Sequence, residues 1–548
     1  MEGGAMSRRA FMTASAASAA AAALPDAEAP VPPEPPREGE PYALASKRLV
    51  FTTWLFVRPG SFGWFSRDGR NVSVAGSEGP TEATFRRGDD PRGLRIAVRP
   101  AARVGPVVRM EKPWEVNGKG IGLATVIQEG NRFRAWGMCG SGGCILESSD
   151  GLHWERPELG LVEHGGDHKN NLVPFSFWEG GVFVDPSAPP EERYKWVGLR
   201  SISREAYDAF RKARPEAWHP RSERKDANLL FALCGAVSQD GVRWTALPEP
   251  LTLEHSDTMV TGYYDERLRR YVIYTRNYMI GQRAATAEGE PPLVWWGGDA
   301  GGVARRSIGR TESADFRRFP LSHVIVEPGP DMPPDDLYYT NGRTSVPGAP
   351  DHHLLFPSVW HTSNDTTSVV VLSSHDGRLW HRLPGPPVFE TAPFGQWDGG
   401  AVFGGTNLIE LPDGGWALPY TGYDVPHKYP RGQFRFAPGL AVWPKGRLVA
   451  LESEGRAAFS TALFLPPGRK ALLNALTMRA GRIEVEVAGP DGAALPGRSF
   501  ADCRPVVGDA YRQPIVWGDR DDLGHAERQP VMLRVRMDQA AIFAIDFE

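Results

Sequence analysis

A seven-residue motif that recurs along the chain constrains the fold more than any other feature of the sequence. The pattern Ser-x-Asp-Gly-x-x-Trp occupies residues 148–154, 238–244 and 374–380, and a weaker copy begins at Thr311. Each full copy follows an apolar stretch, and its Asp-Gly pair supplies a tight turn with positive φ. With the weaker copy included, the motif returns every 60 to 90 residues or so, which is long enough for four strands and their loops. The repeat therefore predicts one sheet of four strands per copy.

Pairs of strand-like segments around these motifs extend the repeat to five units between about residues 107 and 451. The first pair covers residues 120–128 and 132–138, and the last covers residues 400–410 and 415–420. Four-stranded sheets repeated around an axis form a β-propeller, which leaves only short sheet edges. A helical insert over residues 205–213 interrupts the second unit.

The C-terminal part of the chain has a different pattern. Residues 482–487 alternate strictly between polar and apolar side chains, and residues 531–537 alternate again, which predicts a small β-sandwich. We therefore predict an all-β protein with a five-bladed β-propeller followed by a C-terminal β-sandwich. The propeller, with a β-rich lead-in that supplies its opening strand, would cover residues 44–455, and the sandwich residues 456–548.

The N-terminus carries the pattern of an export signal. Arg8 and Arg9 precede Phe11 and an Ala-rich apolar stretch that ends at Leu24, as in twin-arginine signals. We predict a signal over residues 1–29 and a Pro-rich linker over residues 30–43. The mature chain would be periplasmic or extracellular, with the twin-arginine machinery as a partner; the alternative is an Ala-rich tail without this role.

Charge and composition exclude several classes of partner. The formal net charge is −4 and no basic run occurs, so we expect no nucleic-acid partner. After the signal no segment has about 18 consecutive apolar residues, so we expect no membrane span. The zinc-site spacings are absent. We expect no cofactor and no metal site, although a structural calcium ion in the channel stays an open alternative.

Two of the four cysteines flank a Gly-rich turn. Cys139 and Cys144 could face each other across a hairpin and oxidise outside the cytoplasm, or could be two unpaired strand cysteines. The sequence leaves both readings open.

An acidic residue stands at the start of the first strand in each of the five units. In a propeller these strand starts converge on one mouth of the central channel. Breaking a glycosidic bond uses one carboxyl group as proton donor and another as base or nucleophile. Acids at strand starts can also simply cap turns, which is the competing structural explanation. The candidate catalytic residues are Glu115, Glu179, Asp257, Asp336 and Asp398.

Aromatic and polar residues beside these acids are candidate substrate-binding residues. Three of the acids directly follow a tryptophan, whose face offers a sugar ring an apolar platform. The remaining candidates could hydrogen-bond to sugar hydroxyl groups. The set comprises Trp114, Trp178, Trp397, His255, Tyr338, Asn341 and Arg343.

With these motifs the chain resembles five-bladed propeller glycoside hydrolases of families 32 and 43, in particular uncharacterised bacterial proteins. The resemblance is carried by residues 112–115, 395–400 and 499–503, by Gly508-Asp509, and by the Ser-x-Asp-Gly-x-x-Trp motifs. It implies the propeller, the trailing sandwich and activity on sugars. The Trp-Met-Asn-Asp-Pro-Asn and Glu-Cys motifs of fructosidases are absent, so no catalytic role is carried over residue by residue.

The sequence therefore predicts a secreted glycoside hydrolase that acts on a poly- or oligosaccharide. Two alternatives remain. A carbohydrate-binding propeller without catalysis would bind glycans and release no product. A polysaccharide lyase would need a Tyr or His base beside an Arg, and Tyr338 with Arg343 could serve.

Overall fold

The computed structural model describes residues 39–67, 71–72, 83–88, 91–117, 119–140, 142–224, 229–280, 305–430 and 433–548. Residues Pro41–Glu548 form one compact unit. The predicted export signal and most of the predicted Pro-rich linker lie outside the described residues. Among the described residues, no helix combines the length and apolarity needed to cross a membrane.

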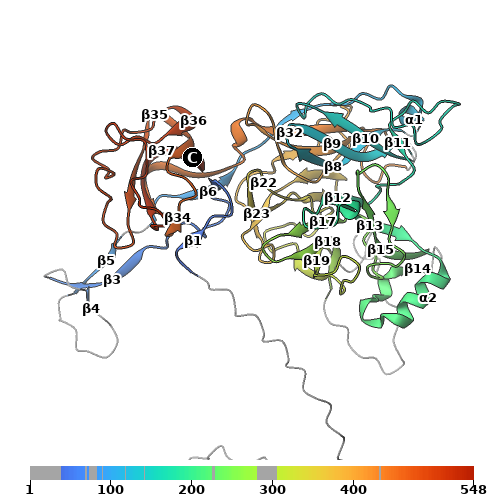
Figure 1. The fold of residues 1–548 in the computed structure, drawn as a ribbon, viewed down its shortest axis with the longest axis horizontal. Coiled ribbons are helices and arrows are strands. Elements are labelled where there is room, and N and C mark those ends of the chain that lie inside the picture. Colours follow the sequence, from blue (N-terminus) through green and yellow to red (C-terminus); the bar gives the residue numbers. More distant parts are fainter. Residues whose placement is uncertain are drawn as a thin grey trace, which may run out of the picture. The chain divides into compact units, whose positions relative to one another are not determined.

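Strands dominate the described chain, and the first three predicted units each form one antiparallel sheet (Figure 1). The first contains β8 (Ile121–Glu129), β9 (Arg132–Cys139), β10 (Gly142–Ser148) and β11 (Leu172–Val173). The second contains β12 (Gly180–Val184), β13 (Tyr194–Ser201), β14 (Glu223–Arg224), β15 (Leu229–Ser238) and β16 (Thr245–Ala246). The third contains β17 (Thr261–Asp265), β18 (Arg270–Met279), β19 (Arg305–Ser313) and β20 (His323–Val326).

The fourth unit is divided into two interleaved sheets, because each of its strands is interrupted. One sheet contains β21 (Asp336–Tyr338), β24 (Ser358–His361), β25 (Thr366–Val369) and β28 (Phe389–Glu390). The other contains β22 (Arg343–Val346), β23 (Ala349–Leu355), β26 (Leu372–Ser374) and β27 (His381–Arg382). The fifth unit contains β29 (Ala401–Gly404), β30 (Ile409–Glu410), β31 (Trp416–Tyr423), β32 (Phe436–Trp443) and, from the N-terminal region, β7 (Ala102–Val104).

Polar side chains on the inner strands connect each unit to the next. Thr125 accepts a hydrogen bond from the backbone N–H of Val182 at 3.1 Å, and Thr261 donates to Asn341 at 2.8 Å. Thr406 closes the ring from the fifth unit to the first, because its Oγ1 lies 3.2 Å from that of Thr125. The all-β propeller prediction is confirmed, while the number of blades stays a prediction.

The Ser-x-Asp-Gly-x-x-Trp motif builds the same turn at each of its three positions. In the second copy, Ser238 Oγ accepts from the Gly241 N–H at 2.9 Å, and Asp240 Oδ1 accepts from two following N–H groups at 2.8 Å. The Gly241 carbonyl then accepts a bond from Trp136 of the preceding unit at 2.6 Å. The turn therefore joins neighbouring units as well as ending a strand.

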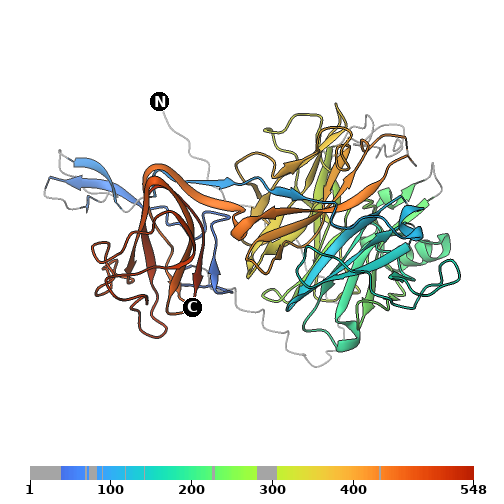
Figure 2. The ribbon, with the colours of Figure 1, turned by 90° about the horizontal axis from the view of Figure 1, so that it is seen from above.

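The C-terminal sheet combines strands from both ends of the chain. It contains β33 (Val449–Ser460), β35 (Ala471–Ala488), β36 (Asp509–Pro514), β37 (Met532–Phe547), β2 (Arg48–Leu49) and β6 (Arg95–Val98). Register irregularities interrupt β35 and β33 along their pairing with β37, and residues from both halves of these strands share one apolar core. Figure 2 shows the N-terminal strand β6 beside the orange strand β33.

Smaller elements complete the fold. The helices are α1 (Pro113–Val116) and α2 (Arg204–Ala213), and the short 3-10 turns are η1 (Pro190–Glu192), η2 (Pro215–Ala217), η3 (Pro220–Ser222) and η4 (Pro444–Gly446). The remaining strands are β1 (Tyr42–Ala43), which pairs with β34 (Phe464–Leu465), and β3 (Ser61–Ser66), which pairs with β4 (Asn71–Val72) and β5 (Ala83–Gly88).

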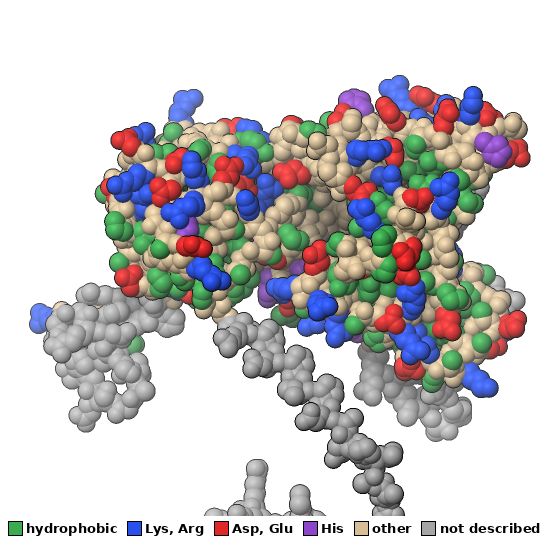
Figure 3. Space-filling model, in the orientation of Figure 1, with side chains coloured by type: hydrophobic (Ala, Val, Ile, Leu, Met, Phe, Trp, Pro, Cys, Tyr) green, Lys and Arg blue, Asp and Glu red, His purple; other side chains and the backbone are tan. Residues whose placement is uncertain are grey.

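Cys139 and Cys144 form a disulfide, with their Cα atoms 5.7 Å apart. Of the two readings that the sequence left open, the structure has the hairpin bridge. On the face of the molecule shown in Figure 3, acidic and basic side chains are interspersed.

Candidate functional site

Three of the five candidate catalytic acids are buried against partners of their own chain. Glu115 lies in α1 and is fully buried, and its carboxylate accepts bonds from Arg156 Nε at 2.6 Å and from the backbone N–H of residues 111 and 112. Asp398 is buried and bound to Tyr420 Oη at 3.0 Å and Arg103 Nη1 at 3.1 Å. These bonds occupy both carboxylates, as expected for structural ion pairs.

Asp336 belongs to a chain of three hydrogen-bonded side chains on β21, β24 and β25. Its Oδ1 lies 2.6 Å from Nδ1 of His361, and Nε2 of the same ring lies 2.9 Å from Ser368 Oγ. The order Asp-His-Ser is that of a serine-nucleophile triad. However, Ser368 is only 2% exposed, so an acyl substrate cannot reach its hydroxyl group. We assign this chain a structural role.

Glu179 and Asp257 differ from the other three acids, because both reach the surface at the starts of neighbouring inner strands. Glu179 directly precedes β12 and is partly exposed, and the Asp257 side chain, just before β17, is 37% exposed. The carboxylate of Glu179 accepts from the backbone N–H of Met259 at 3.2 Å, only two residues beyond Asp257. The Glu179 carboxylate therefore lies beside the chain segment that carries Asp257.

The backbone of this neighbourhood is strained. Glu179 has φ of +55° and Met259 has φ of +28°, values that residues with a side chain rarely adopt. Met259 is held on both sides, since its N–H binds Glu179 and its carbonyl accepts from Asn341 Nδ2 at 2.6 Å. Strain of this kind costs of order 1–3 kcal/mol and tends to collect at functional sites.

A buried cation accompanies Asp257. Arg276, from β18, forms an ion pair with the Asp257 carboxylate, and its Nη2 lies 3.0 Å from Nδ1 of His255. The His255 ring also packs against Phe231, with ring centroids 4.5 Å apart. A guanidinium held in this way fixes the position of the carboxylate and strengthens its hydrogen bonds.

Aromatic side chains from the fourth and fifth units lie beside Glu179. Burial, and then the neighbouring charge of Glu179, raises the pKa of Tyr423 far above its usual value, so this phenol stays protonated. Tyr339 is a further neighbour of Tyr423. The guanidinium carbon of Arg306 lies 4.2 Å from the centroid of the Tyr339 ring. The His427 ring lies 4.6 Å from that of Tyr339. Sugar-binding sites combine aromatic faces with a few polar groups in this manner.

The seven candidate binding residues divide between this site and the core. His255 and Asn341 belong to the site through the contacts above, and Trp178, next to Glu179, is 53% exposed. Trp114 is instead packed in the first unit, where its Nε1 binds Asn171 at 3.2 Å. Trp397 stacks on Tyr420, with centroids 5.7 Å apart.

Tyr338 and Arg343, the pair considered for a lyase, are both buried. Burial raises the pKa of Tyr338 to about 12, which is unfavourable for a base. The Arg343 guanidinium lies 3.3 Å from the ring centroid of Tyr263 and binds His353 at 3.0 Å. Arg343 also lines a cavity of about 320 Å³ at the far ends of the inner strands.

Sequence reasoning missed four residues that surround the two exposed acids: Tyr339, Tyr423, Arg276 and Arg306. Tyr339 directly follows the predicted Tyr338, but strand alternation sends the two side chains to opposite faces. The other three lie on second or third strands of their units, where no motif marks them.

Two cavities lie elsewhere. One, of about 320 Å³, is lined by residues at the far ends of the inner strands, including Gln128, Ser345 and Asn407. The other, of about 820 Å³, is lined by Trp54 and residues 94–99 among others. Glu179 and Asp257 line neither cavity. Within the described part of the chain, no group of three or more His, Cys, Asp or Glu side chains is arranged to hold a metal ion.

No protein-family model matches the chain, and no curated protein sequence matches it. Several solved structures are similar at low identity. A protein described as a glycoside hydrolase is 11% identical, with a TM-score of 0.40, and the match covers 63% of this chain and 92% of that one.

Two further structures match more of the chain. A family-32 β-fructofuranosidase from Bombyx mori is 10% identical, with a TM-score of 0.33 and coverage of 84% and 94% of the two chains. A xylan β-1,4-xylosidase from Bacillus halodurans is 10% identical, with a TM-score of 0.34 and coverage of 80% and 99%. Because these three TM-scores are below 0.5, the function is inferred below from the residues of this chain.

Proposed function

We propose that the chain is a glycoside hydrolase that cleaves a poly- or oligosaccharide at the mouth defined by Glu179 and Asp257. The observation that carries this proposal is that Glu179 and Asp257 are the two candidate acids with solvent-accessible side chains, and that the Glu179 carboxylate accepts from the N–H of Met259, two residues beyond Asp257. Hydrolysis of a glycosidic bond requires two such groups on opposite sides of the bond. The reaction needs no organic cofactor.

The surroundings of the two acids suggest a division of roles. Asp257 is bound to Arg276, which suits a carboxylate that acts in its charged form as base or nucleophile. Glu179 is then the proton donor. Tyr423 stays protonated, so it serves as a hydrogen-bond donor to the substrate or to Glu179 rather than as a base.

The exposed Trp178 and the rings around Tyr339 provide faces on which sugar rings can stack. Trp178, which directly precedes Glu179 in the chain, is 53% exposed and so offers an accessible aromatic face near the start of β12. Asn341 and Arg276 are buried and hold Met259 and Asp257 in position.

We further propose that the chain is exported through the twin-arginine machinery. The paired Arg8 and Arg9 support this proposal, as does the Cys139–Cys144 disulfide, because disulfides persist outside the reducing cytoplasm.

The test is a product screen of the purified chain against polysaccharides and aryl glycosides. We expect reducing sugar from the native chain, and Glu179→Gln or Asp257→Asn to lower kcat/KM by at least about 100-fold, the usual contribution of acid–base catalysis. Asp208→Asn, which changes an exposed acid on α2, is the matched control and should keep full activity. Full turnover by both site variants would overturn the proposal.

The ion pair of Asp257 with Arg276 also favours one alternative, a propeller that binds glycans without cleaving them. Saturable binding with no product on any substrate would favour this alternative. Products that absorb in the ultraviolet would instead identify a lyase, which the raised pKa of Tyr423 disfavours.

A further inference from the structure

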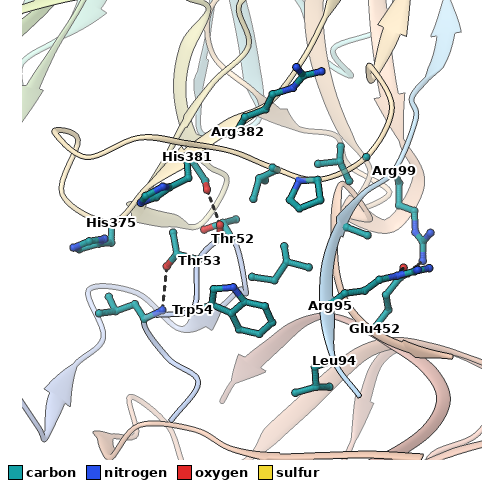
Figure 4. A pocket seen from close by; sticks show the side chains of 18 of the residues that line it. Thr52, Thr53, Trp54, Leu94, Arg95, Arg99, His375, His381, Arg382 and Glu452 are labelled. Carbon is teal, nitrogen blue, oxygen red and sulfur yellow. Dashed lines mark hydrogen bonds and ion pairs between the residues drawn. The ribbon is translucent and has the colours of Figure 1, made fainter. Parts of the chain in front are cut away.

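A second cavity lies away from the two exposed acids, beside the C-terminal sheet. It has a volume of about 820 Å³ and is bounded by the turn at residues 52–55, by residues 94–99 on and around β6, and by the segment 381–386 that follows β27 (Figure 4). Cavities that hold small ligands in proteins have volumes of about 300–1,000 Å³.

Trp54 projects into this cavity, and its side chain is not needed by the core. The residues around it are firmly anchored, because Phe51 and Phe56 are buried and the Thr52 carbonyl accepts from Ser373 Oγ at 2.6 Å. Trp54 itself is 50% exposed at the tip of the turn. The fold thus holds a large aromatic face in place and leaves it open to solvent.

The cavity is mostly apolar, with polar groups at its edge. Leu94, Ile96 and Leu383 line it beside Trp54. His375 and His381 also line it, on the side of the segment that carries β27 (Figure 4). A purely apolar ligand would cover these imidazoles without giving them hydrogen bonds, which is unfavourable.

The charged groups nearby are paired with one another rather than directed at Trp54. Arg95 binds Glu452 at 2.6 Å, and Arg99 binds the same carboxylate, so the three side chains converge beside β6 (Figure 4). Arg95 also binds Glu454 at 2.6 Å. Arg382, the third arginine that lines the cavity, lies 3.5 Å from Asp331, so each of the three arginines has an acidic partner. This pairing favours a neutral ligand over an anionic one.

We infer that this cavity is an accessory binding site for a neutral saccharide, separate from the site at Glu179 and Asp257. A sugar ring has C–H faces that stack on an aromatic face and hydroxyl groups at its edge that can bond to His375, His381 and Thr53. The inference takes from the proposed function only the class of ligand. In this role the site holds a polysaccharide to the protein.

The test is native affinity electrophoresis of the full chain in gels that contain inulin, arabinoxylan or a neutral β-glucan, with polygalacturonate as the acidic comparison. We expect retardation in at least one neutral gel. Trp54→Ala should weaken that binding by about tenfold, a change of about 1.4 kcal/mol, while Trp54→Phe keeps part of it. Trp64→Ala is the matched control, because Trp64 on β3 is 46% exposed and does not line the cavity.

Hydrolysis of a short aryl glycoside separates this inference from the proposed function. Trp54→Ala should leave its kcat/KM unchanged, whereas Glu179→Gln should lose hydrolysis but keep retardation. Equal retardation of Trp54→Ala and native chain, no retardation in any neutral gel, or retardation by polygalacturonate alone would each overturn the accessory site. Retardation that depends on Trp54 without hydrolysis of any substrate would overturn the proposed function and leave the accessory site standing.

Discussion

Glu115 places a carboxylate in the interior together with the groups that neutralise it. Arg156, with only 17% of its side chain exposed, binds the fully buried Glu115 at 2.6 Å. Removing one partner of a buried ion pair leaves the other uncompensated, which usually costs about 3–5 kcal/mol. The position of Glu115 at the head of a unit thus serves the stability of the first sheet.

We predict that Glu115→Gln lowers the free energy of unfolding by about 3 kcal/mol and leaves the activity per folded molecule unchanged. Urea denaturation measures the first quantity, and turnover normalised to folded protein measures the second. Loss of turnover at unchanged stability would instead make Glu115 a catalytic residue.

Two histidines with lowered pKa values make the stability depend on pH. Burial, followed by the charge of Arg221, lowers the pKa of His219 to about 4, and burial lowers the pKa of His352 to about 4. The ordinary value in the unfolded chain is about 6.5. Below pH 6.5 the unfolded chain therefore binds protons that the folded chain does not, and stability falls as the pH decreases from about 6.5 to about 4.

We predict that His352→Gln makes the free energy of unfolding less steeply dependent on pH in this window than in the native chain. His352 Nδ1 lies 3.1 Å from Thr52 Oγ1, a contact that a glutamine amide can replace. Urea titrations at pH 7, 6 and 5 provide the measurement. An identical slope in both chains would show that His352 titrates at its ordinary pKa.

At this scale the sequence located the acids but not their partners. Glu179 and Asp257 became candidates because the repeat places them at strand starts. Nothing in the sequence distinguishes them from Asp398, whose partner Arg103 lies 295 residues away. Partners so distant in sequence are brought together only by the closed ring of sheets.

The turn motif is the element that repeats most faithfully. Gly241 has φ of +73°, and a Cβ atom added there would lie 2.8 Å from Cζ2 of Trp136. The third copy makes the corresponding bond between neighbouring units, since Tyr274 donates to the Gly377 carbonyl at 2.9 Å. A change at such a turn affects two sheets together.

We predict that Gly241→Ala destabilises the chain by about 2–3 kcal/mol through strain and the clash with Trp136. Gly130 is the matched control, because it has φ of +61° and no atom within 4 Å of an added Cβ. Gly130→Ala should cost only about 1 kcal/mol, from backbone strain alone. Equal midpoints for both variants in urea would contradict the role given to the Trp136 contact.

Strand pairs and turns could be predicted from the sequence, because their signals are local. The division of the fourth unit into two sheets could not. Its second strand is interrupted between β23 and β24 at Phe356 and Pro357, and proline has no N–H to donate to the ladder. The alternation of polar and apolar residues does not show whether the strands before and after Pro357 belong to the same sheet.

At the scale of the whole molecule, the N-terminal region completes sheets formed by distant parts of the chain. β7 pairs with β32, β6 pairs with β33, and β2 pairs with β37. The expectation that the lead-in supplies a strand to the propeller agrees with β7. The entry of β2 and β6 into the C-terminal sheet was not foreseen, because pairings across more than 350 residues leave no local pattern.

We predict that a chain starting at Gly39 keeps the thermal midpoint of the full chain within about 2 °C, because residues 41–548 form one compact unit. A chain starting at Gly105 lacks β2, β6 and β7 and should show no cooperative unfolding. Differential scanning calorimetry compares the three chains. A cooperative transition in the shortest chain would contradict the structural role of these strands.

Because β2, β6 and β7 pair with strands near the other end of the sequence, their sheets can form only late in the synthesis of the chain. At about 5–20 residues per second, the roughly 330 residues between β7 and β32 take on the order of tens of seconds to synthesise. During that time β2, β6 and β7 have no partner strand and their edges stay exposed, which favours aggregation. Asp546 of β37, the partner of Arg48 in β2, lies 498 residues later in the chain, so the C-terminal sheet cannot be completed before β37 has been synthesised.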